Sequence, residues 1–217
     1  MTSAQALSIQ KKKLIVLDFT ASWCGPCRVM EEKLWTSPEM IDLADNLVFF
    51  KIDIDSNPGL ASEYRINSLP CVLLTNISGE ELLRINGYSG HNASYLNIFR
   101  KVPSDISLLN TNLLPFVRNE ETVEDIFKLG KAYQDLGKNQ TDRKLKLTFL
   151  ELSNKCFKKV RKKKVNQAKE AELRVILNLV YRGKPEKALA QLKKLPKDYF
   201  GEELEELKQL TNDLCVK

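Results

Sequence analysis

The stretch WCGPC at residues 23–27 follows an apolar run, LIVLDF at residues 14–19, and so places two thiols where a strand turns into a helix. A cysteine at a helix N-terminus feels the positive end of the helix dipole, so its thiolate is favoured and its pKa falls. Cys24 is therefore the predicted attacking thiol. Cys27 lies nearly one helical turn further on, on the same side of the helix, and is the predicted resolving thiol.

A single pair of cysteines at this spacing can also be half of a zinc site. Zinc usually takes four protein ligands, so such a site would need a second pair at comparable spacing. The other cysteines, Cys71, Cys156 and Cys215, stand alone in the sequence, and His91 is the only histidine. The pattern therefore favours redox chemistry of the two thiols, with no metal and no other cofactor.

The residues around the pair resemble the active-site segment of the thioredoxins. Residues 17–27 read LDFTASWCGPC and match in the aspartate, the tryptophan and the whole CGPC. Further stretches resemble thioredoxin landmarks in the same order, namely 51–58, 64–70 and Asn86-Gly87. The likeness covers roughly residues 4–101. It implies a thioredoxin fold, an α/β domain with a mixed central sheet flanked by helices.

The resemblance implies a role for Asp18, which stands near the end of an apolar strand and is expected to be largely buried. Burial raises the pKa of a carboxyl group, so that Asp18 can exchange protons with the thiol of Cys27 through a water. Asp18 is therefore the predicted general base. Lys51, in the neighbouring strand, is expected to lie close to Asp18, where its positive charge offsets the negative charge of the carboxylate. The alternative is a solvated lysine at the sheet edge.

The resemblance also implies a shallow apolar groove for the substrate. Pro70 after Leu69 is expected to form a cis peptide bond facing the disulfide. The backbone of Leu69 is then free to pair with an extended substrate segment, as in a strand. The residues expected to outline this groove are Trp23, Gly25, Pro26, Leu69, Pro70 and Gly87.

The helix after Cys27 departs from the pattern of the small cytosolic thioredoxins. Ser37 is suited to cap a new helix whose first residue is Pro38, so the active-site helix is predicted to break there. This arrangement is similar to the thioredoxin-like domains of the DsbD C-terminal type. Cys71, directly after the expected cis-proline, is interpreted as a small buried strand residue in preference to a third redox thiol.

The size of the chain favours two domains. It has 217 residues, of which 43% are hydrophobic, enough to bury one good core and a second, smaller one. The predicted domains are residues 1–102, thioredoxin-like, and residues 103–217, all-helical. No apolar run approaches the roughly 18–20 residues that a membrane-spanning helix needs, so no membrane insertion is expected.

The compartment is inferred from the N-terminus and the cysteines. The first residues lack the basic and apolar regions of a signal peptide, and an odd number of cysteines with one local pair suits a reducing compartment. A cytoplasmic protein is therefore expected. The segment before Leu14 is too short for the usual opening strand and helix of the fold, which leaves a removed leader and a periplasmic location as the alternative.

The net charge of the chain is +6, and the excess is concentrated in residues 158–164, KKVRKKK. Such a run can bind nucleic acid or acidic lipid head groups. No aromatic residues are interleaved as a stacking platform, and basic side chains complement the C-terminal dipole of a helix. A solvated helix end is therefore favoured, and no nucleic-acid partner is expected.

Beyond residue 102 the pattern indicates helices alone, after a linker marked by Pro103 and Pro115. The hydrophobic spacing predicts a helix from Glu120 that ends at Gly137, a residue suited to a left-handed C-cap. Further helices are predicted over about 142–163, 167–182, from 185 until Pro196 stops the chain, and over about 202–214.

These helices weakly resemble tetratricopeptide repeats around Gly130 and Gly183, where small residues permit close packing of helix pairs. Cys156 and Cys215 are interpreted as core residues. A short helical array of this kind normally needs another surface to pack on. The helical half is therefore expected to cap the first domain or to bind a protein client.

The motif predicts a thiol–disulfide oxidoreductase that reduces protein disulfides, because Gly-Pro between the cysteines resembles the reducing members of the family. The implied partners are protein disulfide substrates and a thiol electron donor, either a reductase or a membrane thiol transporter. Two alternatives stay open: a redox-regulated adaptor that binds a client through its helical half, and a disulfide isomerase.

Overall fold

The computed structural model describes residues 3–163, 165–196, 199 and 205–216. The chain divides into two compact units, Met1–Leu113 and Leu114–Lys217. The predicted boundary between residues 102 and 103 stays a proposal. Lys164 of the basic run and the start of the last predicted helix, residues 202–204, lie outside the described residues.

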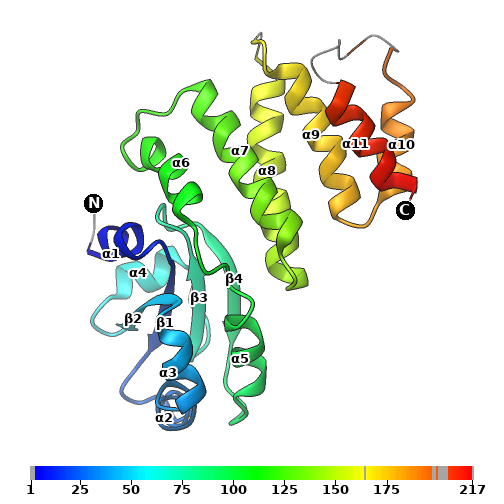
Figure 1. Ribbon diagram of the computed structural model, residues 1–217. Coiled ribbons are helices and arrows are strands. Elements are labelled where there is room, and N and C mark those ends of the chain that lie inside the picture. The colour runs from blue at the N-terminus through cyan, green and yellow to red at the C-terminus, as the bar shows by residue number, and fades with distance from the viewer. Residues whose placement is uncertain (1–2, 164, 197–198, 200–204, 217) are drawn as a thin grey trace. The chain divides into compact units, whose positions relative to one another are not determined.

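A mixed sheet forms the centre of the first unit (Figure 1). Its strands are β1 (Leu14–Thr20), β2 (Leu47–Asp53), β3 (Cys71–Thr75) and β4 (Glu81–Asn86). β1 pairs in parallel with β2 and antiparallel with β3, and β4 continues the sheet antiparallel to β3. The order across the described sheet is β2-β1-β3-β4. The predicted mixed sheet flanked by helices is confirmed.

Both faces of β1 are covered, because all its residues except the last are buried. Alternate side chains of a strand point to opposite faces. Leu17 and Phe19 therefore share one face, where they pack with Leu60 and Tyr64. The intervening Asp18 lies on the other face. The helices of this unit include α1 (Ser3–Lys11), α4 (Pro58–Glu63) and α5 (Ala93–Phe99).

The helix that follows the cysteines is broken, as the sequence predicts. It consists of α2 (Gly25–Met30) and a π-helical turn, η1 (Glu31–Trp35), and α3 (Pro38–Ala44) begins after it. The Ser37 hydroxyl accepts a hydrogen bond from the Met40 amide and caps α3. The π-helical turn is not evident from the sequence, and Trp35 is its last residue.

The N-terminal segment, expected to be too short for the usual opening strand and helix together, contains the helix alone. α1 covers most of the residues before β1. The Ser8 side chain is fully buried and donates a 2.5 Å hydrogen bond to the Lys13 carbonyl. No strand precedes β1 in the described residues.

The predicted linker contains a helix, α6 (Ser107–Val117), with Pro115 in its last turn. Proline lacks an amide N–H and usually ends a helix, which is why the sequence pattern does not reveal α6. The segment is tied to α1 and the residues after it. Ile106 N donates to Lys12 O at 3.0 Å, and the Asn110 side chain donates to Ser8 O at 3.1 Å.

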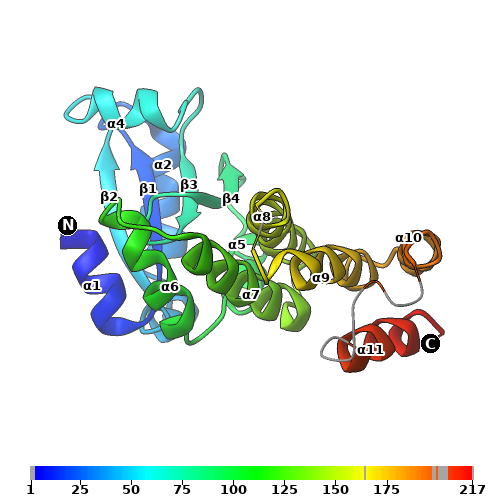
Figure 2. The same cartoon turned by 90° about the horizontal axis from the view of Figure 1, so that it is seen from above.

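The second unit is helical in its described part. Its elements are α7 (Val123–Asn139), α8 (Arg143–Arg161), α9 (Ala168–Tyr181), α10 (Pro185–Leu192) and α11 (Glu205–Val216). α7 and α8 run side by side, and α9 packs against α8 (Figure 1, Figure 2). Thr122 caps α7 through a capping box with Asp125, and Asp142 caps α8.

Gly137 does not end its helix as the sequence analysis expects. It lies inside α7, and its left-handed C-cap is not formed. A Cβ atom at Gly137 would lie 2.7 Å from the Leu150 side chain, and one at Gly130 would lie 2.8 Å from the Phe157 ring. Both glycines therefore permit the close approach of α7 to α8. The tetratricopeptide-like character of the unit stays a prediction.

The described cysteines of this unit differ in burial. Cys156 is buried, as expected for a core residue. Cys215 is only partly buried, and its thiol donates to Pro185 O at 3.6 Å. Cys215 is therefore a peripheral residue of the helical unit, which corrects its assignment to the core.

Gly137→Ala should lower the free energy of unfolding by about 1–3 kcal/mol, because the added methyl group overpacks the α7–α8 contact. In an ordinary helix interior the same change would be stabilising. Urea denaturation of the full chain measures the difference. In a Leu150→Ala background the cost should shrink, since that change makes room for the methyl. An equal cost in both backgrounds would show that the contact is not the cause.

A chain that ends at Lys101 should be less stable than one that ends at Asn119. The shorter chain loses α6 with its two hydrogen bonds to residues 8–12. It also loses the buried side chains Ile106, Leu109 and Leu113, each of which contributes about 1.5–3 kcal/mol when fully buried. Thermal unfolding should show a lower midpoint for the shorter chain. Equal midpoints would place the end of the first domain before α6.

Candidate active site

Cys24 and Cys27 are joined by a disulfide at the N-terminal end of α2. Cys24 is the N-cap residue, and its sulfur accepts a hydrogen bond from the Cys27 amide at 3.2 Å. An amide N–H in this position stabilises a thiolate at Cys24 once the disulfide is reduced. In the disulfide form both cysteines are nearly buried, with Cys24 4% and Cys27 7% exposed.

The disulfide is surrounded by apolar side chains. Ala21 and both cysteines form a buried cluster, against which Ile54 and Leu69 pack. The Leu69–Pro70 peptide bond is cis, and Pro70 O accepts a hydrogen bond from Gly87 N at 2.8 Å. Three of the predicted groove residues are therefore linked: Leu69 packs against the cysteine cluster, Pro70 follows it through the cis peptide bond, and Gly87 is hydrogen-bonded to Pro70.

The other predicted groove residues lie beside the cysteines on the chain. Trp23 is 65% exposed, and its indole N–H donates to Asp55 at 2.9 Å. Gly25 begins α2 with open space where a Cβ would stand, and the exposed Pro26 follows in its first turn. An exposed indole held by a hydrogen bond provides a fixed apolar surface next to the disulfide. The substrate groove itself stays a prediction.

Asp18 is buried in β1, with 7% of its surface exposed. Burial raises the pKa of its carboxyl group from 3.8 to about 6, although a hydrogen bond from Trp35 and the charge of Lys51 both lower it. The Trp35 indole N–H donates to Asp18 Oδ2 at 2.9 Å. Oδ1 is buried and has no hydrogen-bond partner among the described protein groups.

The raised pKa of Asp18 couples stability to pH. The native state binds the proton of Asp18 more tightly than the unfolded chain, so this carboxyl group makes the protein less stable as pH rises from about 4 to about 6. At pH 7 the ionised group costs roughly 3 kcal/mol. A buried carboxylate retained at such a cost is typical of a functional site.

Lys51 lies opposite Asp18 in the pairing of β1 with β2. Its ammonium group forms an ion pair with Glu31 at 2.5 Å, and its side chain is 54% exposed. Both expectations for this residue therefore hold in part: it lies near Asp18 and lowers the pKa of that carboxyl group, and it is also solvated at the sheet edge.

Two cavities meet the Glu31–Lys51 ion pair. One, of about 340 Å³, is also lined by Cys27, and the other, of about 270 Å³, is also lined by Asp18. The ion pair is therefore common to the cavity of the predicted general base and the cavity of the predicted resolving thiol. Its ammonium and carboxylate groups can order water molecules in both cavities.

Glu31 and Trp35 are the site residues that the sequence analysis misses. A weak signal was present, because Cys27, Glu31 and Trp35 recur at intervals of four residues and so share one face of the helix that follows the motif. Their partners could not be found in this way, since Asp18 and Lys51 belong to strands distant in sequence.

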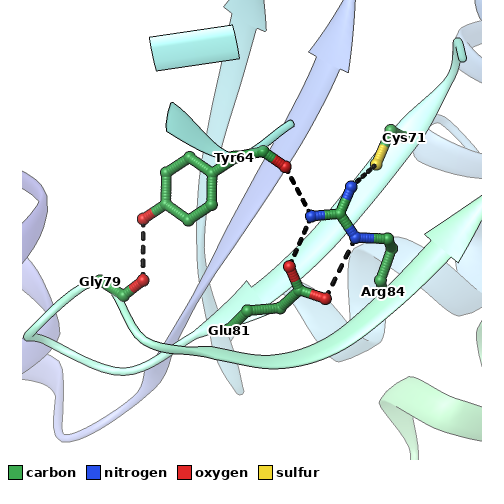
Figure 3. A network of polar contacts seen from close by, with 5 residues as sticks. All are labelled: Tyr64, Cys71, Gly79, Glu81 and Arg84. Atoms are coloured by element: carbon green, nitrogen blue, oxygen red, sulfur yellow. Dashed lines mark hydrogen bonds and ion pairs between the residues drawn. The ribbon is translucent and has the colours of Figure 1, made fainter. Parts of the chain in front are cut away.

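Cys71 is a free thiol with a fixed polar neighbour (Figure 3). The Arg84 guanidinium donates to Cys71 Sγ at 3.7 Å and to Tyr64 O at 2.7 Å, and it forms an ion pair with Glu81. Cys71 is 1% exposed, and burial raises the pKa of its thiol. It is thus a small buried strand residue, in agreement with the sequence-based interpretation.

The described residues contain no group of three His, Cys, Asp or Glu side chains placed to share a metal ion. The reactive groups described at this site are the two cysteines and the carboxyl groups of Asp18 and Glu31. A disulfide at a helix N-terminus, a buried carboxyl group with a pKa of about 6 and an ion pair that lines the cavities of both are suited to thiol–disulfide exchange with proton transfer.

Comparison with known proteins finds similarity to thioredoxins. The sequence model of the thioredoxin family matches residues 3–97. A thioredoxin H-type from Fagopyrum esculentum is 42% identical over 78 residues, which are 35% of this chain and 61% of the relative. Thioredoxin H2 from Arabidopsis thaliana is 38% identical over 36% of this chain and 56% of the relative. The chain thus spans about three fifths of the length of these relatives.

Among solved structures, the thioredoxin NaTrxh from Nicotiana alata is 31% identical, with a TM-score of 0.36, over 46% of this chain and 82% of that one. The oxidised C-terminal domain of DsbD from Neisseria meningitidis is 24% identical, with a TM-score of 0.39, over 46% of this chain and 89% of that one. The match to the thioredoxin family model thus lies over residues 3–97, the part of the chain that holds Cys24 and Cys27.

Proposed function

We propose that this protein is a thiol–disulfide oxidoreductase that reduces protein disulfides. The observation that carries the proposal is the Cys24–Cys27 disulfide at the start of α2, near a buried carboxyl group whose pKa is about 6. The family match over residues 3–97 supports the same reaction. The alternatives of an adaptor and an isomerase have no observation of their own in the described residues.

The reaction has two steps. In the first, the Cys24 thiolate attacks one sulfur of a substrate disulfide, a mixed disulfide forms, and the second substrate sulfur leaves as a thiolate that takes up a proton. In the second, Cys27 transfers its proton toward Asp18 and its thiolate attacks Cys24. The Cys24–Cys27 disulfide forms, and the first substrate sulfur leaves as a thiolate that takes up a proton from water, while Asp18 returns its proton to water. Two electrons pass to the substrate.

Continued turnover needs a thiol donor that returns two electrons to the Cys24–Cys27 disulfide. The donor proposed for this chain is a reductase or a membrane thiol transporter, and its compartment is the cytoplasm or, for a leader-bearing form, the periplasm. No helix in the described residues is both long enough and apolar enough to span a membrane. Gly25-Pro26 between the cysteines favours reduction over oxidation of the substrate.

The helical unit is proposed to bind a protein client and not to take part in the chemistry. Its two cysteines, Cys156 and Cys215, lie in separate helices, α8 and α11. A chain that ends at Asn119 is accordingly proposed to reduce a small disulfide as fast as the full chain does. A client recognised by the helical unit would be reduced more slowly by the shorter chain.

Cys27→Ser should trap a protein substrate as a mixed disulfide on Cys24. The serine cannot attack Cys24, so the second step stops while the first proceeds. Non-reducing electrophoresis of the variant mixed with a disulfide-bonded test protein measures the adduct, which dithiothreitol should release. Cys24→Ser is the matched control and should give no adduct. An adduct on Cys27 in that control would reverse the roles of the two thiols.

Asp18→Asn should slow resolution of the mixed disulfide and leave the first attack by Cys24 nearly unchanged. In the wild type the resolution rate should rise with pH through about 6, because Asp18 accepts a proton only when ionised. The variant should lack this rise, and by losing a buried charge it should be more stable at pH 7 but not at pH 4. Stopped-flow kinetics measures both steps. Identical resolution profiles for the two proteins would remove Asp18 from the reaction.

A further inference from the structure

Residues 65–70 connect the C-cap of α4, Tyr64, to the first residue of β3, Cys71. This connection brings Leu69 against the cysteine cluster. The main-chain N–H and C=O groups of Leu69 form no backbone hydrogen bond among the described residues. Unpaired main-chain groups can receive an extended peptide as an added strand. The placing of this connection therefore affects how well a protein substrate is presented to the disulfide.

The connection is held at its two flanking residues by Arg84 of β4 (Figure 3). The Arg84 guanidinium donates to Tyr64 O at 2.7 Å, and its other terminal nitrogen donates to Cys71 Sγ at 3.7 Å. Glu81 orients the guanidinium through an ion pair. A guanidinium group suits this task, because its planar fork makes several hydrogen bonds in fixed directions.

The last residue of the connection, Pro70, is held through Gly87 by Tyr95 of α5. Gly87 N donates to Pro70 O at 2.8 Å, and the Tyr95 hydroxyl donates to Gly87 O at 2.6 Å. Tyr95 is 2% exposed, and its ring packs against Trp35 and Phe99, so its hydroxyl has a fixed position. Both main-chain groups of Gly87 are thus engaged, one by Pro70 and one by Tyr95.

We propose that Arg84 and Tyr95 are positioning residues for the protein substrate. Together they hold residues 65–70 so that the main-chain groups of Leu69 are presented to an extended substrate segment beside the disulfide. This inference rests on the proposed function, because it concerns how the same site receives its substrate. Both side chains act through the main chain of the connection, so a small disulfide without a peptide backbone gains nothing from them.

Tyr95→Phe tests one of the two residues by removing a single hydroxyl and keeping the buried ring. Burial raises the pKa of the Tyr95 phenol, so the phenol is neutral at pH 7 and its loss removes no charge beside Asp18. The substrates are insulin, a disulfide-bonded protein, and hydroxyethyl disulfide, with dithiothreitol as the thiol donor. KM for insulin should rise about threefold to tenfold, the equivalent of one lost hydrogen bond.

For Tyr95→Phe, kcat with insulin should stay unchanged, because strand pairing holds the substrate equally before and during the attack. A merely structural role would instead lower kcat and impair reduction of hydroxyethyl disulfide as well. Tyr88→Phe is the matched control. The Tyr88 ring packs against Tyr95 at 5.9 Å, but its hydroxyl donates to Asn92, so this variant should keep the wild-type KM for insulin.

Arg84→Met tests the second residue, because methionine keeps the length of the side chain and cannot donate to Tyr64 O. KM for insulin should rise as in Tyr95→Phe, again with kcat unchanged. Glu81→Gln is the control for this variant. It removes the ion pair but leaves the guanidinium, which still donates to Tyr64 O, so its KM should stay within about twofold of the wild type.

The two substrates separate failure of this inference from failure of the proposed function. A wild type that reduces neither insulin nor hydroxyethyl disulfide contradicts the proposed function, and the inference with it. With an active wild type, equal KM values for insulin in Tyr95→Phe and Tyr88→Phe overturn the inference alone. The same holds if Tyr95→Phe and Arg84→Met lose activity equally on both substrates.

Discussion

A carboxyl group buried inside a strand that is covered on both faces is the constraint around which the first unit is arranged. β1 must be apolar to lie at the centre of the sheet, and Asp18 is the only charged residue in it. The cost of burying this group is reduced by Trp35 on one side and by Lys51 on the other. Neither neighbour removes the cost of burial entirely, so the pKa of the carboxyl group stays at about 6.

The break in the active-site helix is part of the same arrangement. Trp35 reaches Asp18 from the end of η1, where the helix widens into a π-helical turn before Ser37 caps α3. A π-helical turn adds a residue to one turn of a helix and changes the direction in which later side chains point, and such turns are frequent at functional sites. The helix thus carries Cys27 at its start and the partner of Asp18 at its end.

The sequence predicts those parts of the structure that depend on local signals. The Ser37 cap, the bounds of α8 and the placing of both cysteines at a strand–helix junction follow from neighbouring residues. The exceptions have tertiary causes. The pattern predicts a linker at Pro115, although α6 extends past it, and a helix end at Gly137, although this residue makes room for Leu150 inside α7. The Glu31–Lys51 pair joins residues 20 positions apart, which no local pattern reveals.

Because the Trp35 indole donates a hydrogen bond to Asp18, the fluorescence of Trp35 can report the protonation state of this carboxyl group. The chain has two tryptophans, and the other, Trp23, is 65% exposed beside the disulfide. Indole emission is sensitive to charge close to the ring. The fluorescence of Trp35 therefore changes when Asp18 is ionised, while the fluorescence of Trp23 changes when a substrate covers the disulfide. Proton transfer and substrate contact can thus be watched separately in the unlabelled chain, by exciting one tryptophan after the other has been replaced by phenylalanine.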